Sequence, residues 1–245
     1  MEPTDRNLKA WEQAHRPRGE VDAIPPAVRE LLPDLAGKNV LHLGCGQATA
    51  ELAELGALVT AVDPSAEAIE AARARAESAA FVQSDPRDLP TELRRRRFHL
   101  VYADIGALDG LADLGAWTAG IAAALRAGGE LILYDEHPAA LCLDAGGHWR
   151  EDYFGEGLWR LGQIVNAVVA AGLSLRRLEE FPSPYRGRKL PGEFALAAVK
   201  RGREQGLPVE CSIGAGEHVR ARPRRAWHAL VTVSFGESAR SAQRG

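Results

Sequence analysis

The sequence predicts an α/β protein built on a doubly wound, mostly parallel sheet. Between positions 38 and 172, short apolar runs alternate with amphipathic helical segments. Helices of this length between strands imply right-handed crossovers and therefore parallel pairing. Two further runs, 173–181 and 194–200, form an expected final strand pair, which brings the sheet to seven strands.

The individual elements follow the apolar pattern along the chain. Before the final pair, strands are expected at 40–43, 58–62, 80–82, 98–102 and 130–134. Helices are expected at 48–55, 64–76, 114–127 and 158–171. Gly56, the pair Gly128-Gly129 and Gly172 follow three of these helices, where glycine commonly ends a helix. The segment 182–192, rich in Pro, Gly and Arg, is expected as a loop.

The two ends of the chain fall outside this pattern and set the expected domain boundaries. Residues 1–36 are expected to form an N-terminal helical cap, and residues 37–200 the α/β domain. Residues 201–245 are an Arg-rich C-terminal extension with one strand-like run, 227–235, and no assigned role.

The composition is that of an ordinary globular protein, with 245 residues, 46% of them hydrophobic, and a net charge of −3. This charge gives no general attraction to nucleic acid or anionic lipid. The three cysteines form no Cys-x-x-Cys pair, so we expect neither a disulfide framework nor a metal site. Without a signal-peptide pattern or an apolar run of 18 residues, we expect a cytoplasmic protein with no membrane partner.

The strongest functional signal is a glycine turn between the first strand and the first helix, Gly44-Cys45-Gly46. Glycine lets the backbone approach a ligand closely, and the helix behind the turn offers free N–H groups. Asp63 ends the next strand, where a carboxylate can accept hydrogen bonds from both hydroxyls of a ribose. The sequence therefore predicts a nucleoside ligand at this turn.

Dinucleotide enzymes share these two features, so a third feature is needed. The dinucleotide fingerprint places a glycine at position 49, but the chain has Thr49 there. A further acid, Asp85, follows the third expected strand and is placed to accept from an adenine amino group. The pattern favours an adenosine ligand that needs no pyrophosphate-binding glycine.

The glycine turn, Asp63, Asp85 and the segments 98–102 and 125–131 together resemble the class I S-adenosylmethionine-dependent methyltransferases, over roughly residues 38–200. The resemblance implies a Rossmann-like methyltransferase fold, S-adenosyl-L-methionine as cofactor, and methyl transfer to an O, N or C atom of a small-molecule acceptor. The residues that it places at the cofactor are His42, Gly44, Cys45, Gly46, Asp63, Pro64, Asp85, Pro86 and Ala103. His42 departs from the family pattern, because many members carry an acid there that helps to hold the cofactor's amino group.

Methyl transfer depends mainly on in-line approach of the acceptor, with a general base needed only for some acceptors. The carboxyl ends of the fourth and fifth strands place Tyr102 and His137 as candidate catalytic residues. His137 has the best unperturbed pKa for a base, and shaping the turn before Pro138 is an equally weighted alternative. His15, in the N-terminal cap, is a third candidate, with plain packing as its alternative.

Two other functions stay open at this point. One is an S-adenosylmethionine-binding protein without methyl transfer, either a lyase or cyclase or a non-catalytic partner. The other is an RNA methyltransferase that uses the run 94–97 of four arginines. That run lacks interleaved aromatic residues, so we expect a solvated loop and no nucleic-acid partner. A homodimer is left open as the assembly.

Overall fold

The computed structural model describes residues 24–144, 147–182 and 190–202, all within one compact unit, Met1–Gln205. Most of the expected N-terminal cap, His15 included, lies outside the described residues. The same holds for nearly all of the C-terminal extension, with its strand-like run 227–235. Among the described residues, no helix has the length and apolar character needed to cross a bilayer.

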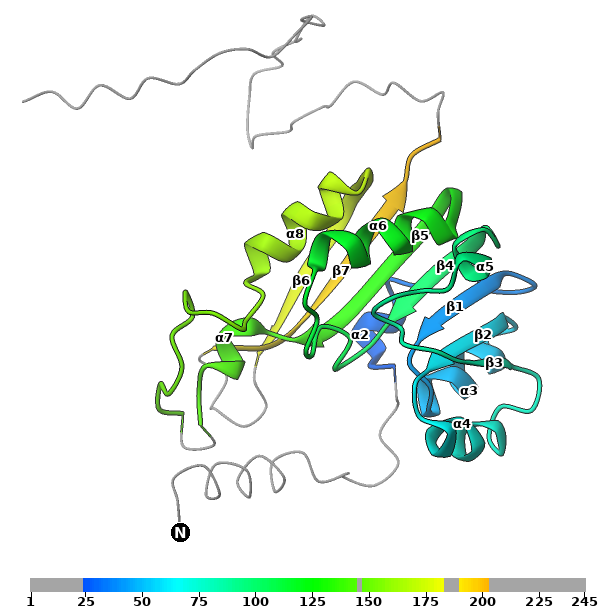
Figure 1. Ribbon diagram of the computed structural model, residues 1–245, viewed down its shortest axis with the longest axis horizontal. Helices are drawn as coiled ribbons and strands as arrows, with labels where there is room; N and C mark the ends of the chain where they lie inside the picture. The colour runs from blue at the N-terminus through cyan, green and yellow to red at the C-terminus, as the bar shows by residue number, and fades with distance from the viewer. Residues whose placement is uncertain (1–23, 145–146, 183–189, 203–245) are drawn as a thin grey trace, which may run out of the picture. The chain divides into compact units, whose positions relative to one another are not determined.

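Seven strands of the described residues form one sheet in the order β3-β2-β1-β4-β5-β7-β6 (Figure 1). Their bounds are β1 (Asn39–Leu43), β2 (Leu58–Asp63), β3 (Ala80–Gln83), β4 (Phe98–Ala103), β5 (Leu125–Glu136), β6 (Leu173–Pro182) and β7 (Pro191–Lys200). Strands β1 to β5 pair in parallel, whereas β7 is antiparallel to both β5 and β6. The predicted doubly wound, mostly parallel sheet is confirmed.

The strand order reverses at β1, which lies between β2 and β4. Leu43, at the end of β1, pairs with Val62 of β2 and with Ala103 of β4, so the three strands end almost level. In open α/β sheets, ligands bind beyond the carboxyl ends of strands at such a reversal. The fold therefore brings the glycine turn, the end of β2 and the end of β4 to one edge.

Helices cover both faces of the sheet (Figure 1). Their bounds are α2 (Pro26–Arg29), α3 (Gln47–Glu54), α4 (Ala66–Arg73), α5 (Thr91–Arg94), α6 (Leu114–Ala124), α7 (Pro138–Leu141) and α8 (Leu161–Ala170). One core layer packs α6 and α8 against Leu41 and Leu43, and the other packs α2 and α3 against Val40 and Tyr102. Burial on both faces explains why the inner strands β1, β2 and β4 are largely apolar.

The predicted strands all lie within observed ones, but the helix expected over 114–127 ends earlier, at Ala124. Leu125 already pairs with Phe98 of β4, and a bulge carries the register on to the pair Leu100–Glu130. A Cβ on Gly129 would lie 2.8 Å from the carbonyl oxygen of Phe98. The prediction that glycine ends α6 was therefore wrong, because Gly129 instead lets β5 lie close against β4.

Smaller differences concern two helix starts and two short helices. The helix expected over 158–171 begins at Leu161. The helix expected from Pro64 begins at Ala66, after Ser65 caps it by accepting a hydrogen bond from the N–H of Ala68 at 3.1 Å. The short helices α5 and α7 were not predicted, because four residues are too few to show a helical period.

Candidate functional site

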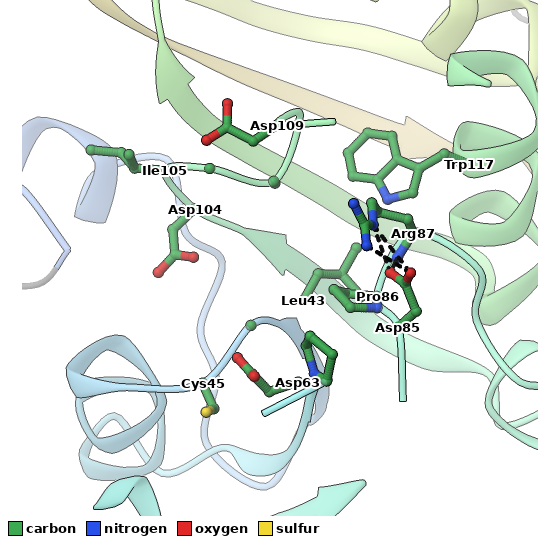
Figure 2. A pocket seen from close by; sticks show the side chains of 14 residues that line it. Leu43, Cys45, Asp63, Asp85, Pro86, Arg87, Asp104, Ile105, Asp109 and Trp117 are labelled. Atoms are coloured by element: carbon green, nitrogen blue, oxygen red, sulfur yellow. Dashed lines mark hydrogen bonds and ion pairs between the residues drawn. The ribbon is translucent and has the colours of Figure 1, made fainter. Parts of the chain in front are cut away.

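A cavity of about 400 Å³ lies beyond the carboxyl ends of β1, β2 and β4 (Figure 2). Its lining residues are Leu43, Gly44, Cys45, Asp63, Pro64, Asp85, Pro86, Arg87, Asp104, Ile105, Gly106, Ala107, Asp109 and Trp117. This volume falls in the range of small-ligand sites. Six of the nine residues predicted to bind cofactor line it, whereas His42, Gly46 and Ala103 do not.

Gly44 keeps the cavity open beside β1. Its φ of 132° is rarely adopted by other residues. A Cβ here would lie 3.4 Å from Oδ1 of Asp104 and 3.6 Å from Nε2 of His42. A side chain at position 44 would therefore fill the space between the turn and the end of β4.

His42 lies directly beneath the turn, with only 1% of its surface exposed. Its Nδ1 lies 2.9 Å from the hydroxyl of Thr49, which accepts a hydrogen bond from the N–H of Gly46 at 3.1 Å. Its Nε2 lies 3.3 Å from Oδ2 of Asp104. His42 thus connects the glycine turn to a carboxylate in the cavity wall without itself lining the cavity.

Asp63 is oriented by its own turn. Its Oδ1 accepts a hydrogen bond from the N–H of Ser65 at 2.8 Å.

The thiol of Cys45 lies beside this carboxylate. Burial, with the hydrogen bond to Asp63 as the second cause, raises the pKa of the Cys45 thiol to about 12. Cys45 is therefore a neutral thiol near pH 7 and lacks the thiolate form that a nucleophile needs.

Asp85 is held by Arg87. Nε of Arg87 lies 2.9 Å from Oδ1 of Asp85, and Nη2 lies 2.9 Å from Oδ2. The backbone N–H of Arg87 also donates to Oδ1 at 2.8 Å. The Arg87 side chain is the main reason that the pKa of Asp85 lies below its ordinary value. Asp85 is thus an ionised group on the cavity wall, held in place by a residue of its own turn.

The loop that follows β4 forms another wall, and Asp135 of β5 holds it. Oδ1 of Asp135 accepts from the N–H of Gly106 at 2.9 Å, and Oδ2 accepts from that of Leu108 at 3.1 Å. Asp135 is only 4% exposed, and this burial raises its pKa to about 6 against the opposing effect of these hydrogen bonds. The wall of the cavity therefore depends on a carboxylate that lies outside it.

Tyr102 and His137, the described candidates for catalysis, do not line the cavity. Tyr102 is fully buried in the core layer with α3, and burial raises the pKa of its hydroxyl. Nδ1 of His137 accepts from the N–H of Ala139 at 3.1 Å, and Nε2 lies 2.9 Å from Oε1 of Glu180. Burial lowers the pKa of His137, with Glu180 acting in the opposite direction. Nδ1 of His137 is therefore taken up by the cap of α7, whereas Nε2 faces Glu180 without a well-aligned hydrogen bond to the described residues.

Several lining residues were missed by the sequence reasoning, chiefly Arg87 and Trp117. Trp117 is 2% exposed and lies beside Arg87 in the cavity (Figure 2). Its position within an apolar helix looked like ordinary core. Arg87 carried one usable signal, because Asp-x-Arg after a strand favours a local turn pair.

Residues 40–129 match a family model described as a methyltransferase domain, and this range includes every residue that lines the cavity. No curated protein sequence matches the chain. Three solved structures are similar in fold. An S-adenosylmethionine-dependent methyltransferase of Mesorhizobium loti has 24% identity over 71% of this chain and 96% of its own, with a TM-score of 0.61. A TehB-like methyltransferase of Corynebacterium glutamicum has 18% identity over 81% and 98%, with a TM-score of 0.56. The [4+2]-cyclase SpnF has 16% identity over 80% and 93%, also with a TM-score of 0.56.

Proposed function

We propose, from the premise that this chain belongs to the class I S-adenosylmethionine-dependent methyltransferase family, that it transfers a methyl group to a small-molecule acceptor. The family implies S-adenosylmethionine as the cofactor. The observation that carries the proposal is that Gly44, Asp63 and Asp85 line the same cavity, at the place where the strand order of the sheet reverses.

The residues present fit this cofactor. Gly44 leaves a space that a Cβ would fill, which suits close approach of a ligand to the backbone. Asp63, oriented by Ser65, would hold the ribose hydroxyls, and Asp85 with Pro86 would face the adenine end. The hydroxyl of Thr49, at the position of the third dinucleotide glycine, bonds to Gly46 within the turn. This arrangement favours an adenosine ligand over a dinucleotide.

The charge of the cavity also supports the proposal. Four carboxylates, those of Asp63, Asp85, Asp104 and Asp109, line it together with Arg87, the single cation among its described lining residues. A concave site with an excess of negative charge favours a positively charged ligand. When bound, the cofactor supplies a methyl group attached to a positively charged sulfur.

The proposed role of the protein in the transfer step is positioning. Holding two reactants in line is worth an effective concentration on the order of 10⁵–10⁸ M, so a base is not required for an acceptor that is already nucleophilic. Within the described residues, the cavity lining contains no histidine or tyrosine. His137 as a general base remains a separate proposal, which its own variants test below.

The fold of the cyclase SpnF supports one alternative, a cofactor-binding enzyme that does not transfer methyl.

The local contacts of the arginine run, residues 94–97, favour a structural role over RNA binding. Arg94 donates to the carbonyl oxygen of Leu89 at 2.6 Å, and the guanidinium of Arg96 lies 5.5 Å from the ring centre of Phe98.

Calorimetry with S-adenosylhomocysteine, with NAD as control, tests the cofactor. Saturable binding of S-adenosylhomocysteine alone is expected, and tight NAD binding would overturn the proposal. The purified protein is then incubated with radiolabelled S-adenosylmethionine and fractionated metabolite extracts. Label should move into a small molecule. Cofactor binding without transfer to any fraction would favour the cyclase-like alternative.

A further inference from the structure

The two ends of the cavity differ in what they offer a ligand. Asp85, Arg87 and Trp117 lie together at one end, and Asp104 lies beside the glycine turn at the other, with Asp63 between them (Figure 2). On the proposed function, on which this inference rests, adenosine occupies the part lined by Asp63 and Asp85. The amino-acid end of the cofactor, with its ammonium and carboxylate groups, is then left for the space between Gly44 and Asp104.

Asp104 is the charged side chain that borders this space. Its carboxylate is 30% exposed, and its Oδ1 lies 3.4 Å from the point where a Cβ on Gly44 would be. A ligand atom that occupies the place of that absent Cβ is therefore in contact range of the carboxylate. An ammonium group there would receive a charge-assisted hydrogen bond.

His42 supplies a second, independent observation at the same space. It is 99% buried, and its Nε2 lies 3.6 Å from the same Cβ position on Gly44. Nε2 has no well-aligned hydrogen bond to any of the described residues, although Oδ2 of Asp104 lies 3.3 Å away. A buried polar nitrogen without a hydrogen bond lowers the stability of the fold unless a hydrogen-bonding partner comes into place.

Nε2 of His42 faces the carboxylate of Asp104 at 3.3 Å, and a proton on Nε2 is favoured beside that negative charge. With its proton there, the ring accepts at Nδ1 from the hydroxyl of Thr49, which itself accepts from the N–H of Gly46. The imidazole therefore presents a donor to Asp104 from behind the cavity wall, and this contact holds the carboxylate on the side of Gly44.

We infer that Asp104 binds the ammonium of the cofactor's amino-acid end and that His42 is the positioning residue that holds the Asp104 carboxylate beside Gly44. His42 occupies the position in β1 where many family members carry an acid. In this chain the negative charge comes from Asp104, which directly follows the neighbouring strand β4. The charge that recognises the ammonium is thus supplied across the β1–β4 pair.

Two probes separate this inference from the proposed function. S-adenosylhomocysteine carries the amino-acid end, and 5′-methylthioadenosine carries the same adenosine and thioether without it. Asp104→Asn should weaken binding of S-adenosylhomocysteine about 10- to 100-fold, the effect of losing one charge-assisted hydrogen bond. Binding of 5′-methylthioadenosine should change by less than about twofold, as measured by calorimetry.

Asp109→Asn is the matched control, because it removes an equal charge from another wall of the same cavity. It should change the affinities for the two probes by the same small factor. If Asp104→Asn also weakens both probes equally, Asp104 acts only through the general field and the inference is wrong. If the parent binds the two probes equally well, the amino-acid end is not recognised and the inference is again wrong. If the parent binds neither probe, the proposed function itself fails.

The role of His42 is tested by non-additivity. His42→Gln should lower the preference for S-adenosylhomocysteine several-fold and should add little to the effect of Asp104→Asn. Thr49→Val, which removes the hydroxyl behind His42, should act in the same direction and covers the case in which His42→Gln fails to fold. Fully additive effects of His42 and Asp104 variants would contradict a positioning role.

Discussion

Arg87 holds the carboxylate of Asp85 with two nitrogens, Nε at 2.9 Å from Oδ1 and Nη2 at 2.9 Å from Oδ2. The backbone N–H of Arg87 adds a third bond at 2.8 Å. A carboxylate has about four acceptor positions, so Asp85 keeps room for a further donor such as an adenine amino group. The pair also fixes where that acceptor points.

This pair leads to a comparison of two variants. If Asp85 accepts from adenine, Asp85→Asn should weaken binding of S-adenosylhomocysteine about tenfold, because one charge-assisted acceptor is lost. Arg87→Gln should weaken it by less than about threefold, since it only loosens the carboxylate. Calorimetry on both variants measures this difference. A loss of affinity in Arg87→Gln equal to that in Asp85→Asn would instead make Arg87 the ligand-binding group.

Asp63 provides a second prediction. Loss of two charge-assisted hydrogen bonds to a ribose should cost about 2–4 kcal/mol of binding, so Asp63→Ala should weaken S-adenosylhomocysteine binding by a factor of tens or more. Ser65→Ala is the matched control, because the bond to Asp63 comes from the backbone N–H of Ser65 and survives the change. That control should lower the melting temperature through loss of the α4 cap while leaving affinity unchanged. Parent-like affinity in a folded Asp63→Ala protein would limit Asp63 to shaping its turn.

The sequence predicted the parts of the cavity that depend on local pattern. Gly44 directly follows β1, Asp63 is the last residue of β2, and Asp85 lies two residues after β3. The pattern of strands therefore placed all three at one edge of the sheet. The loop wall was not predictable in the same way. Asp135 bonds to Gly106, 29 residues away, and that contact depends on the bulged register between β4 and β5. The same bulge explains why the end of α6 was misplaced.

Two other departures have a different origin. His137 was selected as a base from its ordinary pKa and its position after β5, but a pattern does not show which atoms a ring will contact. In the fold, its nitrogens face Ala139 and Glu180. Arg87 was not predicted because the sequence alone does not show which surface arginine pairs with a carboxylate of the cavity.

His137 therefore gives a third prediction. His137→Ala should lower the free energy of unfolding by roughly 1–3 kcal/mol, because it removes the α7 cap and a buried ring. His137→Asn keeps a side-chain acceptor for the N–H of Ala139 and should lose less. Because His137 does not line the cavity and its Nδ1 is taken up by the cap, turnover should keep its parental pH profile in both variants. A 10²- to 10⁴-fold drop in turnover with loss of a pH step, in folded His137→Asn, would restore His137 as the general base.

The buried carboxylate of Asp135 gives the fourth prediction, which concerns pH. Burial raises its pKa to about 6 from an ordinary value of 3.8, so the folded state holds this proton more tightly than the unfolded chain does. The resulting stabilisation is fully present below pH 3.8 and is lost as the pH rises through about 6. A shift of this size corresponds to roughly 3 kcal/mol, at about 1.4 kcal/mol for each pKa unit.

Asp135→Asn removes this titration, and urea unfolding of parent and variant at about pH 4.5 and about pH 7.5 measures the consequence. The stability of the variant relative to the parent should rise by about 2 kcal/mol between those pH values, because roughly a third of the full change already occurs below about pH 4.5. The amide oxygen introduced by the substitution can still accept from the N–H of Gly106, but the amide nitrogen then faces the N–H of Leu108. The cavity wall should therefore loosen even as the stability of the variant relative to the parent rises with pH.

Weaker S-adenosylhomocysteine binding near the upper of the two pH values, together with a stability that rises relative to the parent between them, is the expected signature of Asp135→Asn. It follows because the carboxylate that holds the loop after β4 is also the group whose burial costs stability once it is ionised. Equal pH dependence of stability in the two proteins would show that Asp135 does not titrate in this range. Unchanged affinity in the variant would separate Asp135 from the cavity wall.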